Sequence, residues 1–203
     1  MKKFNYLWLY MLLVMGAVSN NAHAGLVLDT VGTSVNNSML TLDSNDFVAA
    51  EFSLGDGQVI TDLKAYINAG NSGVAGDGFT FHLYSADGKA GLPGTDLYSF
   101  DSTYQADGWN GVSNLNVSGL TAGNYWLALE VSGSSNLELP GFSTSGSAPA
   151  LAYAFNAGSG YSIMTGANFG VQVSSVPLPA AFWLFGSSLC SFLFSMRRKS
   201  SSL

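Results

Sequence analysis

The sequence is poor in cysteine and in positive charge. Its one cysteine, Cys190, lies in an apolar C-terminal segment, so no disulfide can form within residues 25–175. Stability there must come from core packing and backbone hydrogen bonds. Only Lys64 and Lys89 of the seven basic residues fall in this region, against all 13 acidic residues, which gives a formal charge of −11. Such a surface repels phosphate backbones, which excludes nucleic-acid binding, and is compatible with divalent cations and with neutral or cationic polymers.

Histidine is equally scarce, and this limits the chemistry. His82 is the only histidine of residues 25–175, so a zinc site with three His or Cys ligands is excluded. A Ser-His-Asp arrangement would need His82 as its base, but no Gly-x-Ser-x-Gly motif accompanies it. A two-carboxylate glycosidase stays open as a third hypothesis. Because acids such as Asp56 and Asp107 lie beside glycine in turns, the turns explain them, and we expect no enzymatic activity.

The first 24 residues have the pattern of a signal peptide. Two lysines precede an apolar run from Phe4 to Val18, which is shorter than the ~20 residues of a membrane-spanning helix. Ala22 and Ala24 then place small residues at the −3 and −1 positions before Gly25. This predicts cleavage between Ala24 and Gly25 by the secretion machinery. An uncleaved N-terminal anchor is the alternative.

A second apolar segment lies near the C-terminus. Residues 176–196 carry no charge and number 21, enough to cross a hydrocarbon layer of ~30 Å. Arg197, Arg198 and Lys199 follow directly. We expect a transmembrane helix over about 178–196, with its basic end in the cytoplasm and residues 25–175 outside the inner membrane. A buried C-terminal helix is the alternative.

The start of this segment carries a recognisable motif, followed by an apolar helix and the basic triplet. The motif is Val176, Pro177, Leu178, Pro179 and Ala180. In this order and at this terminus, the three features resemble the PEP-CTERM class of sorting signals, in its Val-Pro-Leu-Pro-Ala variant. The resemblance implies processing by an exosortase, a membrane-embedded protease-transpeptidase. It also implies a role at the cell surface, in an exopolysaccharide or biofilm layer. Cys190 is then an apolar filler of the helix, with lipidation as the alternative.

Residues 25–175 show the period-two alternation of β-strands, and no capped helical period occurs among them. Leu63, Ala65 and Ile67 share one face of the run Gln58–Asn68, and its other face is mostly polar. Within Gly78–Ser85, Phe79, Phe81 and Leu83 alternate in the same way with Thr80, His82 and Tyr84. The run Asn124–Ser132 is apolar and aromatic, with Tyr125, Leu127, Leu129 and Val131 on one face, and it leaves the side of Trp126 open. Weaker candidates are Thr95–Asp101, Gly111–Val117, Leu151–Asn156 and Phe169–Val173.

Short strands joined by Gly-rich turns predict an all-β domain, a jelly-roll-like β-sandwich. The string Gly55-Asp56-Gly57 is typical of a hairpin turn between Phe47–Leu54 and the following strand. The Gly- and Ser-rich stretch from Ser132 to Ser147 predicts a long loop. The last residues before Val176 are expected to be a short linker.

Two strings in this region are similar to bacterial secreted β-sandwiches of the choice-of-anchor group. They are the strand Phe79–Tyr84 with the downstream turn Gly91-Leu92-Pro93-Gly94-Thr95, and the stretch Gly119–Leu127. The resemblance implies a sandwich fold that different proteins attach to different anchors. It implies no particular activity.

Ligand-binding candidates come from aromatic and acidic residues. Pyranose rings stack on flat aromatic faces, which makes Tyr66, Tyr84, Tyr104, Trp109 and Trp126 candidates for a sugar platform, with core packing as the alternative for each. Asp43, Asn45 and Asp46 offer clustered oxygen ligands for calcium, with a solvated turn as the alternative. We therefore expect a non-enzymatic surface or matrix protein, or else a carbohydrate-binding module that calcium supports.

Overall fold

In a computed structural model, the chain is described over residues 24–32, 35–68, 73–131, 133, 135–143 and 146–177. Residues Ala24–Val176 form one compact unit. Most of the predicted signal peptide and all of the predicted transmembrane segment after Pro177 lie outside the described residues. Within the described part of the chain, no helix is long and apolar enough to cross a membrane.

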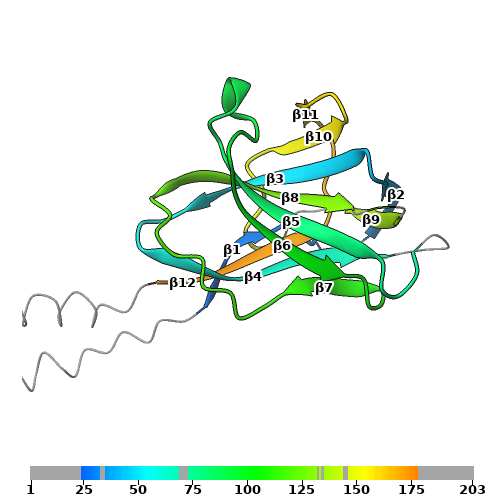
Figure 1. Cartoon of the computed structure of the whole chain (residues 1–203), viewed down its shortest axis with the longest axis horizontal. Helices are drawn as coiled ribbons and strands as arrows, with labels where there is room; N and C mark the ends of the chain where they lie inside the picture. The colour runs from blue at the N-terminus through cyan, green and yellow to red at the C-terminus, as the bar shows by residue number, and fades with distance from the viewer. Residues whose placement is uncertain are drawn as a thin grey trace, which may run out of the picture. The chain divides into compact units, whose positions relative to one another are not determined.

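The described chain is all-β, as the alternation predicted, and it contains three antiparallel arrangements of strands (Figure 1). A four-stranded sheet has the order β1-β12-β4-β7, a six-stranded sheet has the order β11-β10-β3-β8-β5-β6, and a two-stranded ribbon pairs β2 with β9. The strands are β1 (Gly25–Asp29), β2 (Val35–Leu42), β3 (Asp46–Leu54), β4 (Gln58–Ile67), β5 (Gly78–Ser85), β6 (Asp96–Thr103), β7 (Gly108–Val112), β8 (Gly123–Val131), β9 (Leu137–Phe142), β10 (Tyr153–Ala157), β11 (Tyr161–Met164) and β12 (Val171–Pro177).

The two larger sheets share one hydrophobic core. The inward faces of their strands bury the alternating residues that the sequence pattern selected, and Leu63, Phe81 and Leu127 are at most 1% exposed. The predicted polar face of β4 needs one correction, because Ile60 is also fully buried. The segment carrying Val117 crosses over it, and the amide of Ile60 donates to the Val117 carbonyl at 3.0 Å.

The ribbon of β2 and β9 contradicts the predicted loop from Ser132 to Ser147. Residues 137–142 pair with β2, and Leu137 and Leu139 are fully buried in the main core. The Gly- and Ser-rich flanks hid this short strand in the sequence. Pro140 has no backbone N–H to donate. It is tolerated there because each strand of a two-stranded ribbon has one edge that is not paired with another strand of the ribbon.

The predicted hairpin at Gly55-Asp56-Gly57 is wrong. This turn carries the chain from β3 in the six-stranded sheet to β4 in the four-stranded sheet, so the two strands belong to different layers. Gly57 adopts a φ of 65°, which suits a sharp change of direction between layers. The turn signal itself was correct, and only the pairing across it was not.

The predicted linker before Val176 is also wrong, because β12 continues through Pro177 between β1 and β4. Gly25 pairs with Ser175. The contact is reinforced by Asp29, whose carboxylate accepts hydrogen bonds from Gln172 and Ser147. Burial opposes ionisation of this carboxyl, but these hydrogen bonds lower the pKa of Asp29 below its usual range.

Candidate functional site

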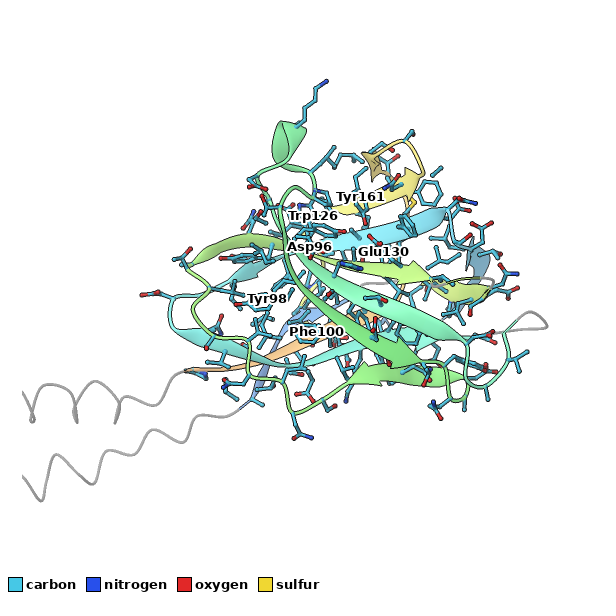
Figure 2. The ribbon with its side chains drawn as sticks, in the orientation of Figure 1. Asp96, Tyr98, Phe100, Trp126, Glu130 and Tyr161 are labelled. Atoms are coloured by element: carbon cyan, nitrogen blue, oxygen red, sulfur yellow. The ribbon has the colours of Figure 1, made fainter. Side chains whose placement is uncertain are left out.

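Five polar and aromatic side chains meet on the outer face of the six-stranded sheet. They come from four strands and are called the outer cluster: His82 and Tyr84 from β5, Asp96 from β6, Glu130 from β8 and Tyr161 from β11. Figure 2 shows Asp96, Glu130 and Tyr161 on one part of the sheet, together with Trp126. Residues as far apart in the sequence as His82 and Tyr161 thus contribute to one surface.

Glu130 is the centre of the outer cluster. Its Oε1 accepts hydrogen bonds from the hydroxyl of Tyr84 at 3.0 Å and from that of Tyr161 at 3.2 Å. Its Oε2 lies 3.6 Å from Nε2 of His82, and Nδ1 of His82 lies 2.8 Å from Oδ2 of Asp96. The His82 side chain is 18% exposed and that of Asp96 43%, so this network borders solvent.

The aromatic rings of the outer cluster are packed against each other. The rings of His82 and Tyr84 stack with centroids 5.7 Å apart, and the ring of Tyr161 lies edge-on to Tyr84 at 6.0 Å. Burial, and then the negative charge of Glu130, raises the pKa of Tyr84 and of Tyr161 well above the usual range. Both hydroxyls therefore stay protonated and can donate at any physiological pH.

Small residues beneath the outer cluster explain how distant strands reach it. Ala154, Ala49 and Ala128 are paired in register across β10, β3 and β8, and all three are fully buried. Tyr161 and Tyr84 pack against this alanine row and against Trp126, which is 1% exposed. The outer face of the sheet thus has a small apolar core of its own.

The loop between β5 and β6 is fixed over this face by Asp87. Its carboxylate accepts hydrogen bonds from the hydroxyls of Ser85 and Thr95 and from the Thr95 amide, which lower the pKa of Asp87 to about 2. Trp126 donates from Nε1 to the Gly91 carbonyl at 2.9 Å. Gly94 must stay glycine, because a Cβ there would lie 2.0 Å from Asp87 Oδ1. The Pro-Gly-Thr turn therefore braces the outer cluster.

A second group of aromatic residues, the aromatic patch, lies on the outer face of the four-stranded sheet. It consists of Tyr66 on β4, Trp109 on β7 and Phe142 on β9. Tyr66 is paired directly with Trp109, and its ring meets those of Trp109 and Phe142 edge-on, each with centroids 5.5 Å apart. Trp109 is 38% exposed, whereas Phe142 is buried. Trp109 is thus the solvent-facing member of a braced aromatic group.

The five predicted sugar-platform residues do not form one surface. Tyr66 and Trp109 are together, but Tyr84 lies on the other sheet. Tyr104 and Trp126 are buried, as the core-packing alternative had it. The prediction missed Glu130, Asp96 and Tyr161 as site residues, because only strand register brings Asp96 and Glu130 to His82 and Tyr161 to Tyr84.

The predicted calcium ligands Asp43, Asn45 and Asp46 lie in and beside a turn. Oδ1 of Asp43 accepts the backbone amide of Asn45 at 2.8 Å, and the amide of Asp46 donates to the Asp43 carbonyl at 3.1 Å. The turn joins β2 of the ribbon to β3, which is what the solvated-turn alternative expected. Among the residues that the structure describes, no group of three or more His, Cys, Asp or Glu side chains could hold a metal ion.

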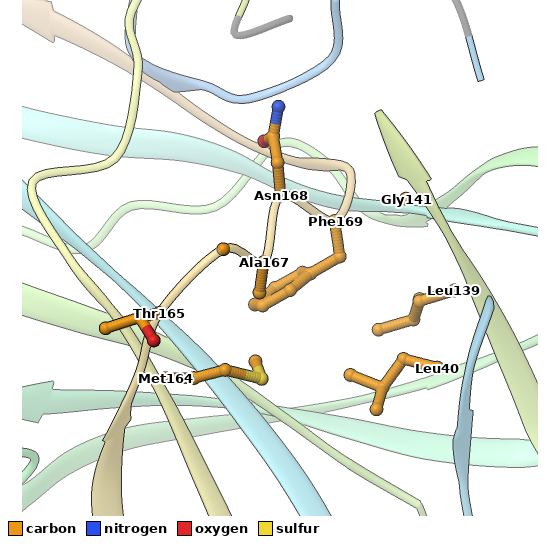
Figure 3. Close-up of a pocket in the computed structure, with 9 residues that line it drawn as sticks. Leu40, Leu139, Gly141, Met164, Thr165, Ala167, Asn168 and Phe169 are labelled. Carbon is orange, nitrogen blue, oxygen red and sulfur yellow. The ribbon is translucent and has the colours of Figure 1, made fainter. Parts of the chain in front are cut away.

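A cavity of about 250 Å³ lies at the ribbon end of the molecule, apart from the outer cluster. Leu40, Leu139 and Met164 point into it in Figure 3. It is completed by Gly141 and residues 165–169, none of which is ionisable. Asn168 is engaged with the Tyr153 hydroxyl and the Phe142 carbonyl. This cavity offers apolar contact and no acid–base chemistry.

The predicted sorting residues are described only in part. Val176 and Pro177 belong to β12. Leu178, Pro179, Ala180, Arg197, Arg198 and Lys199 lie outside the described residues, as do the signal-peptide residue Ala22 and the rest of residues 1–23. Ala24 and Gly25 are described and exposed, and Gly25 begins β1.

No family model and no curated protein matches the sequence. The fold is similar to the crystal structure of the cysteine protease and lectin-like domains of Cwp84, a surface layer associated protein of Clostridium difficile. The TM-score is 0.50 at 10% sequence identity, and the match covers 72% of this chain and 37% of that chain. The match therefore spans little more than a third of that chain, and the likeness concerns the fold alone.

Proposed function

We propose that this chain is an exported, non-enzymatic protein of the cell surface or extracellular matrix, and that its outer cluster binds a saccharide. The observation that carries the binding proposal is the network around Glu130. One carboxylate, held by two tyrosine hydroxyls beside a histidine and a second carboxylate, borders solvent on the outer face of the sheet.

The chemistry of this cluster fits a sugar better than other ligands. Carboxylates accept hydrogen bonds from sugar hydroxyls, and the partly exposed rings offer apolar faces for the C–H side of a pyranose. Because the predicted ectodomain carries a formal charge of −11, we expect a neutral or amino-sugar polymer and not an acidic one. Asp43 is engaged by its own turn, so we expect binding without calcium.

The export proposal has separate support. The predicted first residue of the mature chain, Gly25, is also the first residue of β1. We propose that an exosortase-type protease recognises the motif from Val176 to Ala180 and removes the following helix, leaving the protein in an exopolysaccharide or biofilm layer. Mass spectrometry of the surface fraction should then find an N-terminus at Gly25 and no peptide beyond Ala180. An intact basic tail there would refute processing.

The finer classification of the fold is part of this proposal. Consecutive strands β3 to β5 and β6 to β8 alternate between the two larger sheets, as strands do in double-sheet jelly rolls. We propose a jelly-roll-like β-sandwich, with a signal helix before it and a transmembrane helix after it.

Binding is tested with the full chain purified in mild detergent on an array of neutral, amino and acidic glycans, with and without EDTA. We expect selective binding that EDTA leaves unchanged. Glu130→Gln keeps the shape of the side chain but removes its charge, and should weaken binding at least tenfold. Asp56→Asn, an equivalent change in the exposed turn after β3, is the matched control. No glycan binding, or equal binding by Glu130→Gln and wild type, would refute the proposal.

A further inference from the structure

We infer that the aromatic patch is a second saccharide surface and that the domain is therefore divalent, bridging two polysaccharide strands. This inference rests on the proposed function of the outer cluster. It starts from Trp109, which is 38% exposed on the sheet opposite to that cluster. Of the two tryptophans in the predicted ectodomain, Trp126 is buried, so Trp109 is the one with an available ring.

The rings of the aromatic patch are packed against each other before any ligand binds. Tyr66 lies between Trp109 and Phe142, with interplanar angles of 86° and 87° to the two rings. Gly170 closes the patch from behind, because a Cβ on it would lie 2.6 Å from Cβ of Tyr66. A ring that is already fixed loses little conformational entropy on binding, which favours it as a stacking platform.

The strand pair next to Tyr66 and Trp109 on this face carries a lysine and a glycine. By strand register, Lys64 and Gly111 are the next pair on the same outer face as Tyr66 and Trp109. Gly111 must lack a side chain, because a Cβ there would lie 2.1 Å from the Leu63 carbonyl oxygen. Gly111 therefore adds no side chain to this face, and Lys64 supplies a hydrogen-bond donor on it. A flat aromatic ring beside polar groups suits a pyranose unit of a neutral polymer.

The two surfaces face away from each other. The aromatic patch is on the outer face of the four-stranded sheet and the outer cluster is on the outer face of the six-stranded sheet, while the inner faces share one core. A short stretch of polymer bound at one surface cannot reach the other. One molecule would thus hold two strands, which gives a matrix protein a physical means of cross-linking polymer.

A bridging assay tests this inference with the full chain in mild detergent. Beads carry one neutral polysaccharide (mixed-linkage β-glucan, galactomannan or dextran in separate arms) and are loaded with protein. They are then offered the same polymer in soluble, fluorescent form. We expect the loaded beads to capture soluble polymer in at least one arm. Trp109→Ala should still bind the beads but capture at least tenfold less soluble polymer.

The controls separate this inference from the proposed function. Trp109→Leu keeps apolar bulk without an aromatic face and should behave like Trp109→Ala, whereas Tyr98→Ala, at an equally exposed aromatic residue, should bridge like wild type. Wild type that binds beads without bridging overturns divalency alone. Bridging by Trp109→Ala at the wild-type level also overturns it, because a dimer that binds polymer with the outer cluster of each copy would then explain the capture. Failure to bind beads in every arm overturns the proposed function itself.

Discussion

The two tryptophans of the folded unit should differ sharply in their contribution to stability. Trp126 points to the outer side of a sheet, where a side chain would ordinarily face water, yet it is 1% exposed and packs on the alanine row. A tryptophan buries roughly 150–250 Å², which at ~25 cal/mol per Å² corresponds to about 4–6 kcal/mol. The alanine Cβ and residual burial in the unfolded chain reduce this figure. Trp126→Ala should therefore lower the free energy of unfolding by about 3–5 kcal/mol.

Urea unfolding followed by far-ultraviolet circular dichroism measures this loss, with Trp109→Ala as the control. Because Trp109 is 38% exposed, its removal should lower the free energy of unfolding by only about 1–2 kcal/mol. Hydrogen exchange in the β5–β6 loop should accelerate in Trp126→Ala alone, since the bond from Nε1 to Gly91 is lost. If Trp126→Ala were no more destabilising than Trp109→Ala, the second core on this face would be refuted.

Three further predictions concern the same face. Burial and a nearby carboxylate raise the pKa of Tyr84 and Tyr161, so their contribution to stability is complete below about pH 10 and declines at higher pH. Urea unfolding at a series of pH values above 10 should show this decline in the free energy of unfolding, and Tyr84→Phe should make the decline smaller. Hydrogen bonds lower the pKa of Asp87 to about 2, so its contribution is present above ~pH 4 and is lost as the pH falls toward 2; Asp87→Asn should remove this part of the acid transition. Gly94→Ala should lower the free energy of unfolding by about 1–3 kcal/mol, because the added Cβ would clash with Asp87. Gly123→Ala, with no atom within 4 Å of the added Cβ, should change the free energy of unfolding little. Equal melting temperatures of the two variants would contradict this prediction.

Strand faces were predictable from the sequence wherever a strand has one buried and one polar face. The alternation in β4 and β5 placed Leu63 and Phe81 in the core, and both are buried, whereas β8 also buries Trp126 and Ala128 on its outer face. Ile60 was misplaced because its cover comes from a crossing segment, which period-two patterning does not encode. Strand β9 was missed because it is short and lies among Gly- and Ser-rich residues, and β2 was missed because Asn36, Asn37 and Ser38 occupy its first half.

Strand partners were much less predictable than strand faces. Alternation gives the side on which a residue lies, but the neighbouring strand depends on the whole fold. The pairing of Gly25 with Ser175 joins the two ends of the folded unit, and no local pattern announces it. For the same reason Gly55-Asp56-Gly57 was assigned to a hairpin, since the turn chemistry is the same whether the chain folds back or changes layer.

The outer cluster shows where this limit matters for function. The period-two alternation correctly placed His82 and Tyr84 on the same face of their strand. It gave no reason to include Tyr161 in the outer cluster, because the strand of Tyr161 is two strands beyond β3 in the sheet. Tyr161 reaches Glu130 because Ala154, Ala49 and Ala128 occupy adjacent positions on three strands, and no large side chain intervenes. Each alanine is unremarkable in its own strand, and only their shared register forms the row. A bulky substitution such as Ala49→Leu should therefore push Tyr161 away from Glu130 although neither residue is mutated, which makes strand register the determinant of the site.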